Sequence, residues 1–117
     1  MSNIKAYPDI NQCKKLAEIL PLESADMGWY YSCNPQAARN QMWVGTKSEN
    51  ADIPCWSLAA LLDVIPQVKL DNIKQYDKKY WRCCAYFASD WHNSNWCDNP
   101  VDACYEMILK LHELKML

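Results

Sequence analysis

The residues with the clearest capacity for chemistry are cysteines and a histidine in the last third of the chain. Thiolates and imidazoles are the usual ligands of zinc, which favours close ligand pairs separated by two to four residues. The candidate ligands are Cys83, Cys84, His92, Cys97 and Cys104. Their spacing fits zinc poorly, because Cys83 and Cys84 are adjacent and would point to opposite faces of a strand. We therefore expect no bound metal and no other cofactor.

The same segment also contains the residue types of nucleophilic catalysis. Such catalysis needs a nucleophile, a base within hydrogen-bonding reach and a group that orients the base. The candidates are Cys84 or Cys97 as nucleophile, His92 as base, and Asp90 or Asp98 as orienting group. No nucleophile–base motif of a recognised type surrounds them. We therefore expect that the protein is not an enzyme and has no catalytic residue.

Basic and aromatic residues are interleaved between positions 69 and 82, and such a pattern could bind single-stranded nucleic acid by base stacking. These residues are Lys69, Lys74, Tyr76, Lys78, Lys79, Tyr80, Trp81 and Arg82. Asp71 and Asp77 dilute their positive charge, and the whole chain has a formal net charge of -2. A basic surface is the first requirement for binding nucleic acid, so nucleic acid is a disfavoured partner.

Two tryptophans flank a run of polar residues in the segment Trp91-His92-Asn93-Ser94-Asn95-Trp96. Tryptophan, tyrosine and arginine dominate binding energy at interfaces, so Trp91, His92, Asn95 and Trp96 form a candidate interaction surface. Alternatively, the two indoles could cover the hydrophobic core. A third interpretation places a small nucleotide-like ligand between an indole and the N-terminus of the helix that follows, because helix N-termini can bind anions.

The composition indicates one folded domain over residues 1–117, since 50% of the residues are hydrophobic and 22% are charged. The N-terminus lacks the apolar stretch of a secretory signal, and no apolar run approaches the ~20 residues of a membrane helix. The seven cysteines are an odd number, which argues against a disulfide framework. We therefore expect a cytoplasmic protein with free cysteines and no membrane partner.

Hydrophobic periodicity predicts three helices, over residues 9–20, 53–64 and 100–115. Asp9 is the expected N-cap of the first helix, and Gln12 completes a capping box. Asp52 or Ile53 is the expected cap of the second helix. Asn99 is the expected cap of the third helix, because it precedes a proline that suits the first helical position.

Alternation of apolar and polar residues predicts three strands, over residues 28–33, 41–46 and 79–88, with a weak extra strand near 69–75. The polar segment 34–40 favours a hairpin between the first two strands, and residues 89–98 are expected to form a loop. The elements follow the order αββαβα. This order predicts an α+β fold, with a small mixed or antiparallel sheet of three to four strands packed against three helices.

Several short segments follow one another in an order shared with a known family. They are Met27-Gly28-Trp29 in an early strand, Asp52-Ile53-Pro54-Cys55-Trp56 at a helix start, Tyr80-Trp81-Arg82-Cys83 in a strand, and Asp98-Asn99-Pro100-Val101-Asp102-Ala103-Cys104 at the last helix start. Over residues 25–113 this layout resembles the phage ABA-sandwich domain family, although the first helix departs from the family pattern. The resemblance implies a fold and supplies no catalytic residue, because the matching residues are helix caps and core positions.

Further segments resemble short proteins of gut Bacteroides prophages and mobile elements that have no assigned activity. They are Leu16-Ala17-Glu18-Ile19-Leu20-Pro21, Asn99-Pro100-Val101-Asp102-Ala103-Cys104 and Lys110-Leu111-His112-Glu113-Leu114. We therefore predict a phage- or mobile-element-encoded accessory protein. It would act as a non-enzymatic protein-interaction module whose partner is another protein or a second copy of itself. The alternatives are binding of a small nucleotide-like ligand or weak binding of nucleic acid.

Overall fold

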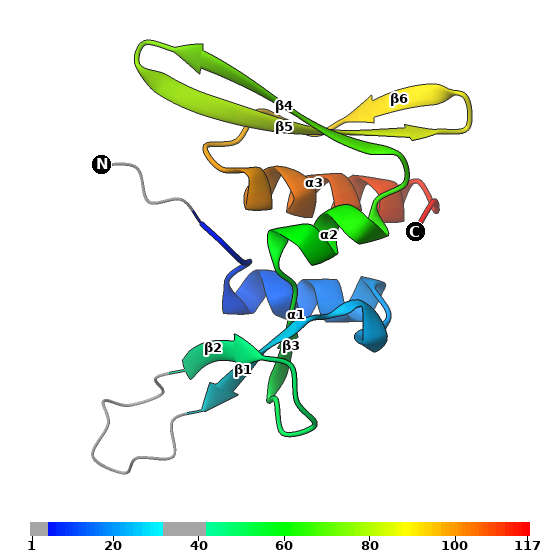
Figure 1. Cartoon of the computed structure of the whole chain (residues 1–117). Coiled ribbons are helices and arrows are strands. Elements are labelled where there is room, and N and C mark those ends of the chain that lie inside the picture. The colour runs from blue at the N-terminus through cyan, green and yellow to red at the C-terminus, as the bar shows by residue number, and fades with distance from the viewer. Residues whose placement is uncertain (1–4, 32–41) are drawn as a thin grey trace.

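The computed structural model describes residues 5–31 and 42–117. Its elements are α1 (Ile10–Ile19), the 3-10 helix η1 (Leu22–Ser24), β1 (Met27–Tyr31), β2 (Met42–Thr46), β3 (Ile53–Cys55), α2 (Leu58–Val64), β4 (Val68–Gln75), β5 (Lys78–Phe87), β6 (Asp90–Asn93) and α3 (Pro100–Glu113). The strands form two antiparallel sheets, in the orders β2-β1-β3 and β4-β5-β6, and the three α-helices lie between them (Figure 1). The predicted α+β class is confirmed. The six described strands form two sheets, where the sequence led us to expect one sheet of three to four strands.

The first helix begins where its capping residues predict. The Asp9 carboxylate accepts a hydrogen bond from the backbone N–H of Gln12 at 2.8 Å, and the Gln12 side chain accepts one from the backbone N–H of Asp9 at 3.0 Å. This reciprocal capping box satisfies two N–H groups that the first helical turn leaves unpaired. The predicted hairpin pairing is also found, since β1 and β2 pair antiparallel from Met27↔Thr46 to Tyr31↔Met42. The segment expected to connect them lies outside the described residues.

The predicted second helix begins too early, because residues 53–55 are a strand. Ile53 pairs with Trp29 of β1, and α2 starts only at Leu58. The N-cap is Ser57, whose hydroxyl accepts a hydrogen bond from the backbone N–H of Ala60 at 3.2 Å. The proline between Ile53 and Cys55 is compatible with this strand because β3 lies at the edge of its sheet, where a missing N–H is tolerated.

The predicted strands at 69–75 and 79–88 are confirmed as β4 and β5, but residues 89–98 do not form a continuous loop. Asp90–Asn93 is β6, which pairs antiparallel with the end of β5. The connecting residues Ala88 and Ser89 both have positive φ values, 54° and 64°. Positive φ at both positions is the mark of a type I′ turn, which usually contains glycine or asparagine. The absence of these residues explains why the sequence did not indicate this hairpin.

The main hydrophobic core lies between the β4-β5-β6 sheet and α3, with α1 and α2 closing its other side (Figure 1). Its fully buried members include Leu16, Trp56, Leu61, Cys83, Ala85, Val101, Cys104, Met107, Ile108 and Leu111. A smaller core of Cys13, Ile53 and Cys55 lies at the β2-β1-β3 sheet.

The predicted cap of α3 is confirmed, because the Asn99 side chain accepts a hydrogen bond from the backbone N–H of Asp102 at 2.8 Å.

All six described cysteines are free thiols, and Cys33 lies outside the described residues. Within the part of the chain that is described, no helix combines the length and the apolar character needed to cross a bilayer.

Candidate interaction surface

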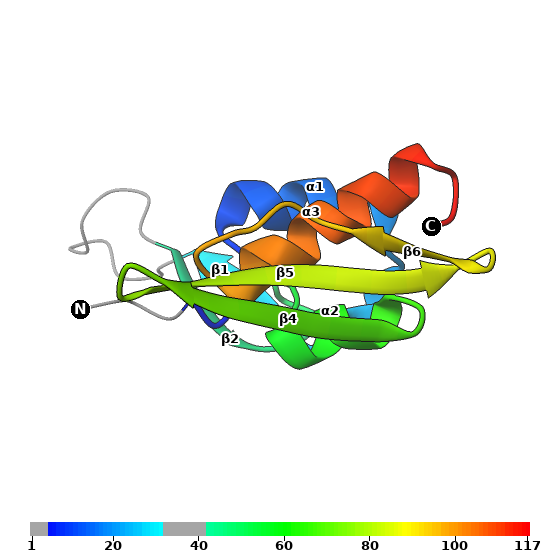
Figure 2. The same cartoon turned by 90° about the horizontal axis from the view of Figure 1, so that it is seen from above.

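The outer face of the β4-β5-β6 sheet is the candidate interaction surface. Side chains alternate along β5, so the buried Cys83 and Ala85 face the core while Arg82 and Tyr86 face outward. No described element covers this outer face, which lies toward the viewer in Figure 2. We call it the aromatic face, and define it by Lys69, Asp71, Ile73, Tyr80, Arg82, Tyr86, Trp91 and Trp96.

Two tryptophans on the aromatic face are both partly exposed and held in place. Trp91 is 47% exposed, its ring packs edge-on against Tyr86 at 5.3 Å between centroids, and Lys69 Nζ lies 5.0 Å from the ring centroid. Trp96 is 39% exposed, and the Arg82 guanidinium carbon lies 4.6 Å from its ring centroid. Both cations lie within the range of cation–π attraction. The face therefore presents two indoles whose positions are fixed before any partner arrives.

Asp71 connects the two cations of this face. Its carboxylate lies 3.0 Å from Arg82 Nη2 and 3.9 Å from Lys69 Nζ. The hydrogen bond from Arg82 lowers the pKa of Asp71; burial opposes this shift, and the contacts with Cys84 and Lys69 reinforce it. Asp71 therefore stays ionised and holds Arg82 against the Trp96 ring. The aromatic face thus contains a negative charge among its positive ones.

The predicted interaction residues do not all lie together. Trp91 and Trp96 share the aromatic face, as the interaction hypothesis requires. His92 lies opposite Ala85, a core residue, so it points to the other side of the sheet, where its Nε2 is buried without a hydrogen-bond partner. Asn95 donates a hydrogen bond from Nδ2 to Glu106 of α3 at 3.1 Å. The candidate surface is therefore corrected by leaving out His92 and Asn95.

Six of the eight residues that define the aromatic face were not among the predicted interaction residues: Lys69, Asp71, Ile73, Tyr80, Arg82 and Tyr86. Arg82 and Tyr86 lie on the outer side of β5 because they alternate in sequence with the buried Cys83 and Ala85. What the sequence could not show is that a second hairpin brings Trp91 beside Tyr86, and that the chain returns along β5 and brings Trp96 to Arg82.

The candidate nucleophiles lie in surroundings that keep them protonated. Cys97 donates a hydrogen bond from Sγ to Glu106 at 2.7 Å; burial and this carboxylate raise the pKa of Cys97 to about 12. Burial and the Asp71 carboxylate also raise the pKa of Cys84. Neither thiol makes a hydrogen bond with His92 among the described residues, so the candidate nucleophiles and the candidate base do not form a pair.

The five candidate zinc ligands do not converge on one point either. Cys83 lies in the core in contact with Cys104, while Cys84 faces the opposite side of the sheet. No group of three or more histidine, cysteine, aspartate or glutamate side chains within residues 5–31 and 42–117 could hold a metal ion.

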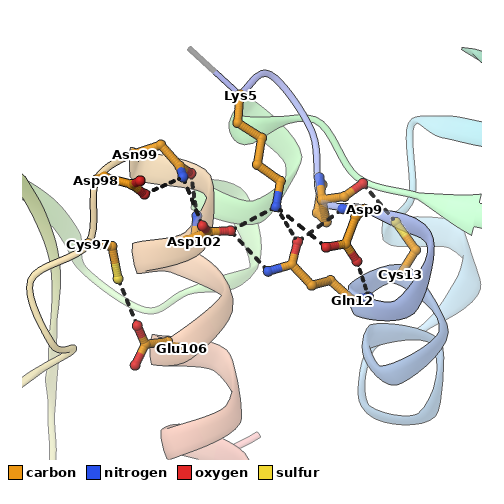
Figure 3. Close-up of polar contacts among 10 residues, drawn as sticks. Lys5, Asp9, Gln12, Cys13, Cys97, Asp98, Asn99, Asp102 and Glu106 are labelled. Atoms are coloured by element: carbon orange, nitrogen blue, oxygen red, sulfur yellow. Dashed lines mark hydrogen bonds and ion pairs between the residues drawn. The ribbon is translucent and has the colours of Figure 1, made fainter. Parts of the chain in front are cut away.

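The N-terminus of α3, the third candidate site, is occupied by the protein's own polar side chains (Figure 3). The Asp102 carboxylate accepts hydrogen bonds from Lys5 Nζ and Gln12 Nε2, both at 2.9 Å, and from Asn99 Nδ2 at 2.8 Å. Burial raises the pKa of Asp102, but these three hydrogen bonds outweigh burial and the net shift is downward. An ionised carboxylate at this end of the helix opposes an anionic ligand, so the geometry gives no support to a nucleotide-like ligand here.

Comparison of the chain with protein-family models, with curated proteins and with solved structures found no match. The chain's own geometry therefore carries the functional argument.

Proposed function

We propose that this protein is a non-enzymatic interaction module that docks a partner protein on its aromatic face. The observation that carries the proposal is the pair of partly exposed indoles, Trp91 and Trp96, held beside Arg82 and Lys69 on an uncovered sheet face. Tryptophan, tyrosine and arginine are the residue types that contribute most binding energy at protein interfaces. Because these side chains are already positioned, binding costs little additional side-chain entropy.

A protein partner suits the aromatic face better than nucleic acid does. The ionised Asp71 lies between Lys69 and Arg82 and would repel a phosphate brought to either cation. Both cations are already engaged by this carboxylate and by an indole ring. A protein surface can offer apolar groups and charges of both signs, and so can match a face of mixed polarity.

We place this module among phage- or mobile-element-encoded accessory proteins of the bacterial cytoplasm. The support is the resemblance of its helix caps and core positions to the phage ABA-sandwich family and to short prophage proteins. The free state of the six described cysteines also suits a reducing compartment.

Photo-crosslinking followed by reconstitution tests the proposal. A photoreactive benzophenone amino acid at Tyr86 captures the partner in cells, and the captured protein is then purified and titrated with the wild-type module. The double variant Trp91→Ala/Trp96→Ala should weaken binding by about 100-fold or more, since each hot-spot residue contributes at least about 2 kcal/mol. Its melting temperature should stay close to that of the wild type.

Trp43→Ala is the matched control, because Trp43 is 54% exposed but lies on β2 of the other sheet. This variant should bind as the wild type does. Unchanged binding by the double variant, or crosslinks to nucleic acid alone, would contradict the proposed function.

A further inference from the structure

Strand β4 forms one edge of the β4-β5-β6 sheet. It pairs with β5 over its whole length, from Val68↔Ala85 to Gln75↔Lys78, and no described strand pairs with its other side. Figure 2 shows this edge running along the outside of the sheet. An unpaired edge eight residues long can receive another strand.

The hydrogen bonds on the far side of β5 show which β4 residues face the open edge. Trp81 exchanges two backbone hydrogen bonds with Cys97, at 2.6 and 2.7 Å, and the Cys83 carbonyl accepts one from Ser94 at 2.9 Å. The backbone groups of Trp81 and Cys83 are therefore turned away from β4.

In an antiparallel pair, residues whose backbone groups turn outward lie opposite residues whose groups also turn outward. Asn72 lies opposite Trp81 and Leu70 lies opposite Cys83, so the N–H and C=O groups of Asn72 and Leu70 point to the open edge. By the same alternation, those of Val68 and Lys74 do so too. The edge thus presents backbone donors and acceptors at every second residue, which is the pattern that another polypeptide strand complements.

The hairpin that carries this edge is basic, although the whole chain is not. Residues 68–82 contain five cations (Lys69, Lys74, Lys78, Lys79 and Arg82) and two carboxylates (Asp71 and Asp77), an excess of three positive charges in a chain whose net charge is -2. Ile73, on the same strand, is 41% exposed. The edge therefore matches a segment that is acidic and carries some apolar side chains.

We infer that the open edge of β4 accepts an extended acidic segment of the partner protein as a fourth strand. The inference rests on the proposed function, and it adds where and in what form the partner binds. Lys69 and Ile73 of β4 face the same side as Tyr80 and Arg82, so the added strand extends the aromatic face into one continuous docking surface. A second copy is a poorer occupant, because its β4 carries the same lysines.

Amide hydrogen exchange with a defined probe tests the inference directly. The probe is a synthetic octapeptide of alternating glutamate and valine. It is added to the full chain, and exchange of the protein's backbone amides is measured by NMR. In the free protein the N–H groups of Leu70, Asn72 and Lys74 should exchange quickly, while those of Lys69 and Ile73 are protected by β5. The peptide should slow exchange of the first set and leave the second set unchanged.

A proline substitution separates backbone pairing from side-chain contact. Asn72→Pro removes an N–H that β5 does not use, and proline is tolerated on an open edge. It should weaken peptide binding by about tenfold or more, since at least one hydrogen bond is lost and the ring obstructs pairing. Asn72→Ala is the matched control, because it changes the same side chain but keeps the N–H, and it should bind the peptide as the wild type does.

Protection of the Ile73 amide shows whether the proline variant keeps its hairpin. A glutamate–valine peptide that is N-methylated at alternate residues tests backbone pairing with the unaltered protein. This peptide should not bind. Equal binding by the methylated peptide, by a lysine–valine peptide, or by Asn72→Pro with its hairpin intact overturns the inference. Binding of oligothymidylate that leaves the amides of Leu70 and Asn72 unprotected from exchange would also overturn the inference. So would a dimer of the protein that the Asn72→Pro substitution dissociates.

The crosslinked partner distinguishes failure of this inference from failure of the proposed function. If the partner needs Trp91 and Trp96 but binds Asn72→Pro as well as the wild type, the aromatic face stands and the edge inference is wrong. If the partner binds the tryptophan double variant normally but is lost with Asn72→Pro, the edge stands and the proposed docking on the aromatic face is wrong.

Discussion

The Asp102 carboxylate accepts hydrogen bonds from three parts of the chain, so removing it should destabilise the fold. The carboxylate receives hydrogen bonds from Lys5 in the N-terminal segment, from Gln12 of α1 and from the Asn99 cap of α3 (Figure 3). Asp102→Ala removes all three contacts at once. It also removes a negative charge from the first turn of α3, where the helix dipole favours one.

The size of the effect follows from these contacts. Each hydrogen bond typically contributes about 1 kcal/mol to the free energy of unfolding. Because the Asp102 side chain is 30% exposed, solvent reduces the ionic contribution from Lys5. We therefore expect Asp102→Ala to lower the free energy of unfolding by about 2–3 kcal/mol at pH 7. Lys5→Ala should cost less, about 0.5–1 kcal/mol, because the contacts of Lys5 with Asp102, Gln12 and Asp9 are all partly exposed to solvent.

Urea denaturation followed by tryptophan fluorescence measures both effects. The control is Asp63→Ala, an exposed acidic residue on α2, which should change the free energy of unfolding by no more than about 0.5 kcal/mol. A loss at Asp102→Ala no greater than that of this control would refute the reasoning, since it would mean that the three contacts stabilise nothing.

The same site predicts a pH dependence with a definite sign. Because the pKa of Asp102 is lowered in the folded state, its contribution is fully present above the unfolded value of about 4 and is lost as the pH falls through the lower folded value. The difference in unfolding free energy between wild type and Asp102→Asn should stay constant from pH 7 to about pH 5 and narrow below about pH 4. A difference that grew on acidification would contradict the lowered pKa.

Three further predictions concern caps, close packing and thiols. Asn99→Ala should lower the free energy of unfolding by about 1 kcal/mol, measured by urea denaturation, because it removes the N-cap of α3; an unchanged midpoint would contradict the cap. Gly28→Ala should cost about 1–3 kcal/mol, because its new Cβ would lie 2.6 Å from the Ala51 Cβ; a stability equal to wild type would show that β1 can shift freely. Titration of freshly prepared protein under denaturing, non-reducing conditions should find seven thiols, and a count of five or fewer would reveal a disulfide.

The elements that the sequence predicts correctly are those with strong local signals. Asp9 with Gln12, and Asn99 before a proline, are caps whose hydrogen bonds are made within three residues, so no distant contact is needed to place α1 and α3. The start of α2 was predicted wrongly because residues 53–56 are apolar enough for a helix or a buried strand. Pairing with Trp29, far away in sequence, makes them a strand.

The hairpin that creates β6 has no local signal, because Ala88 and Ser89 adopt positive φ values that such residues rarely adopt. Pairing between β5 and β6 offsets the cost of this turn. Missing β6 also explains why His92 was wrongly placed on the candidate interaction surface. Had β6 been recognised, alternation would have separated His92 from Trp91 at once.

The aromatic face shows which part of a site sequence reasoning can reach. Trp91 and Trp96 were predicted from their own surroundings, but what fixes them comes from elsewhere in the chain. Trp96 reaches Arg82 because Cys97 pairs with Trp81, which brings the segment after β6 back along β5. Lys69 reaches Trp91 because β4 and β6 flank the same central strand. Lys79 is next to Tyr80 in the sequence, whereas in the fold Lys79 Nζ lies over the Trp81 ring and Arg82 stacks on Trp96. The chemistry of this surface is therefore a property of the sheet topology, and the variants that test it should be chosen across strands.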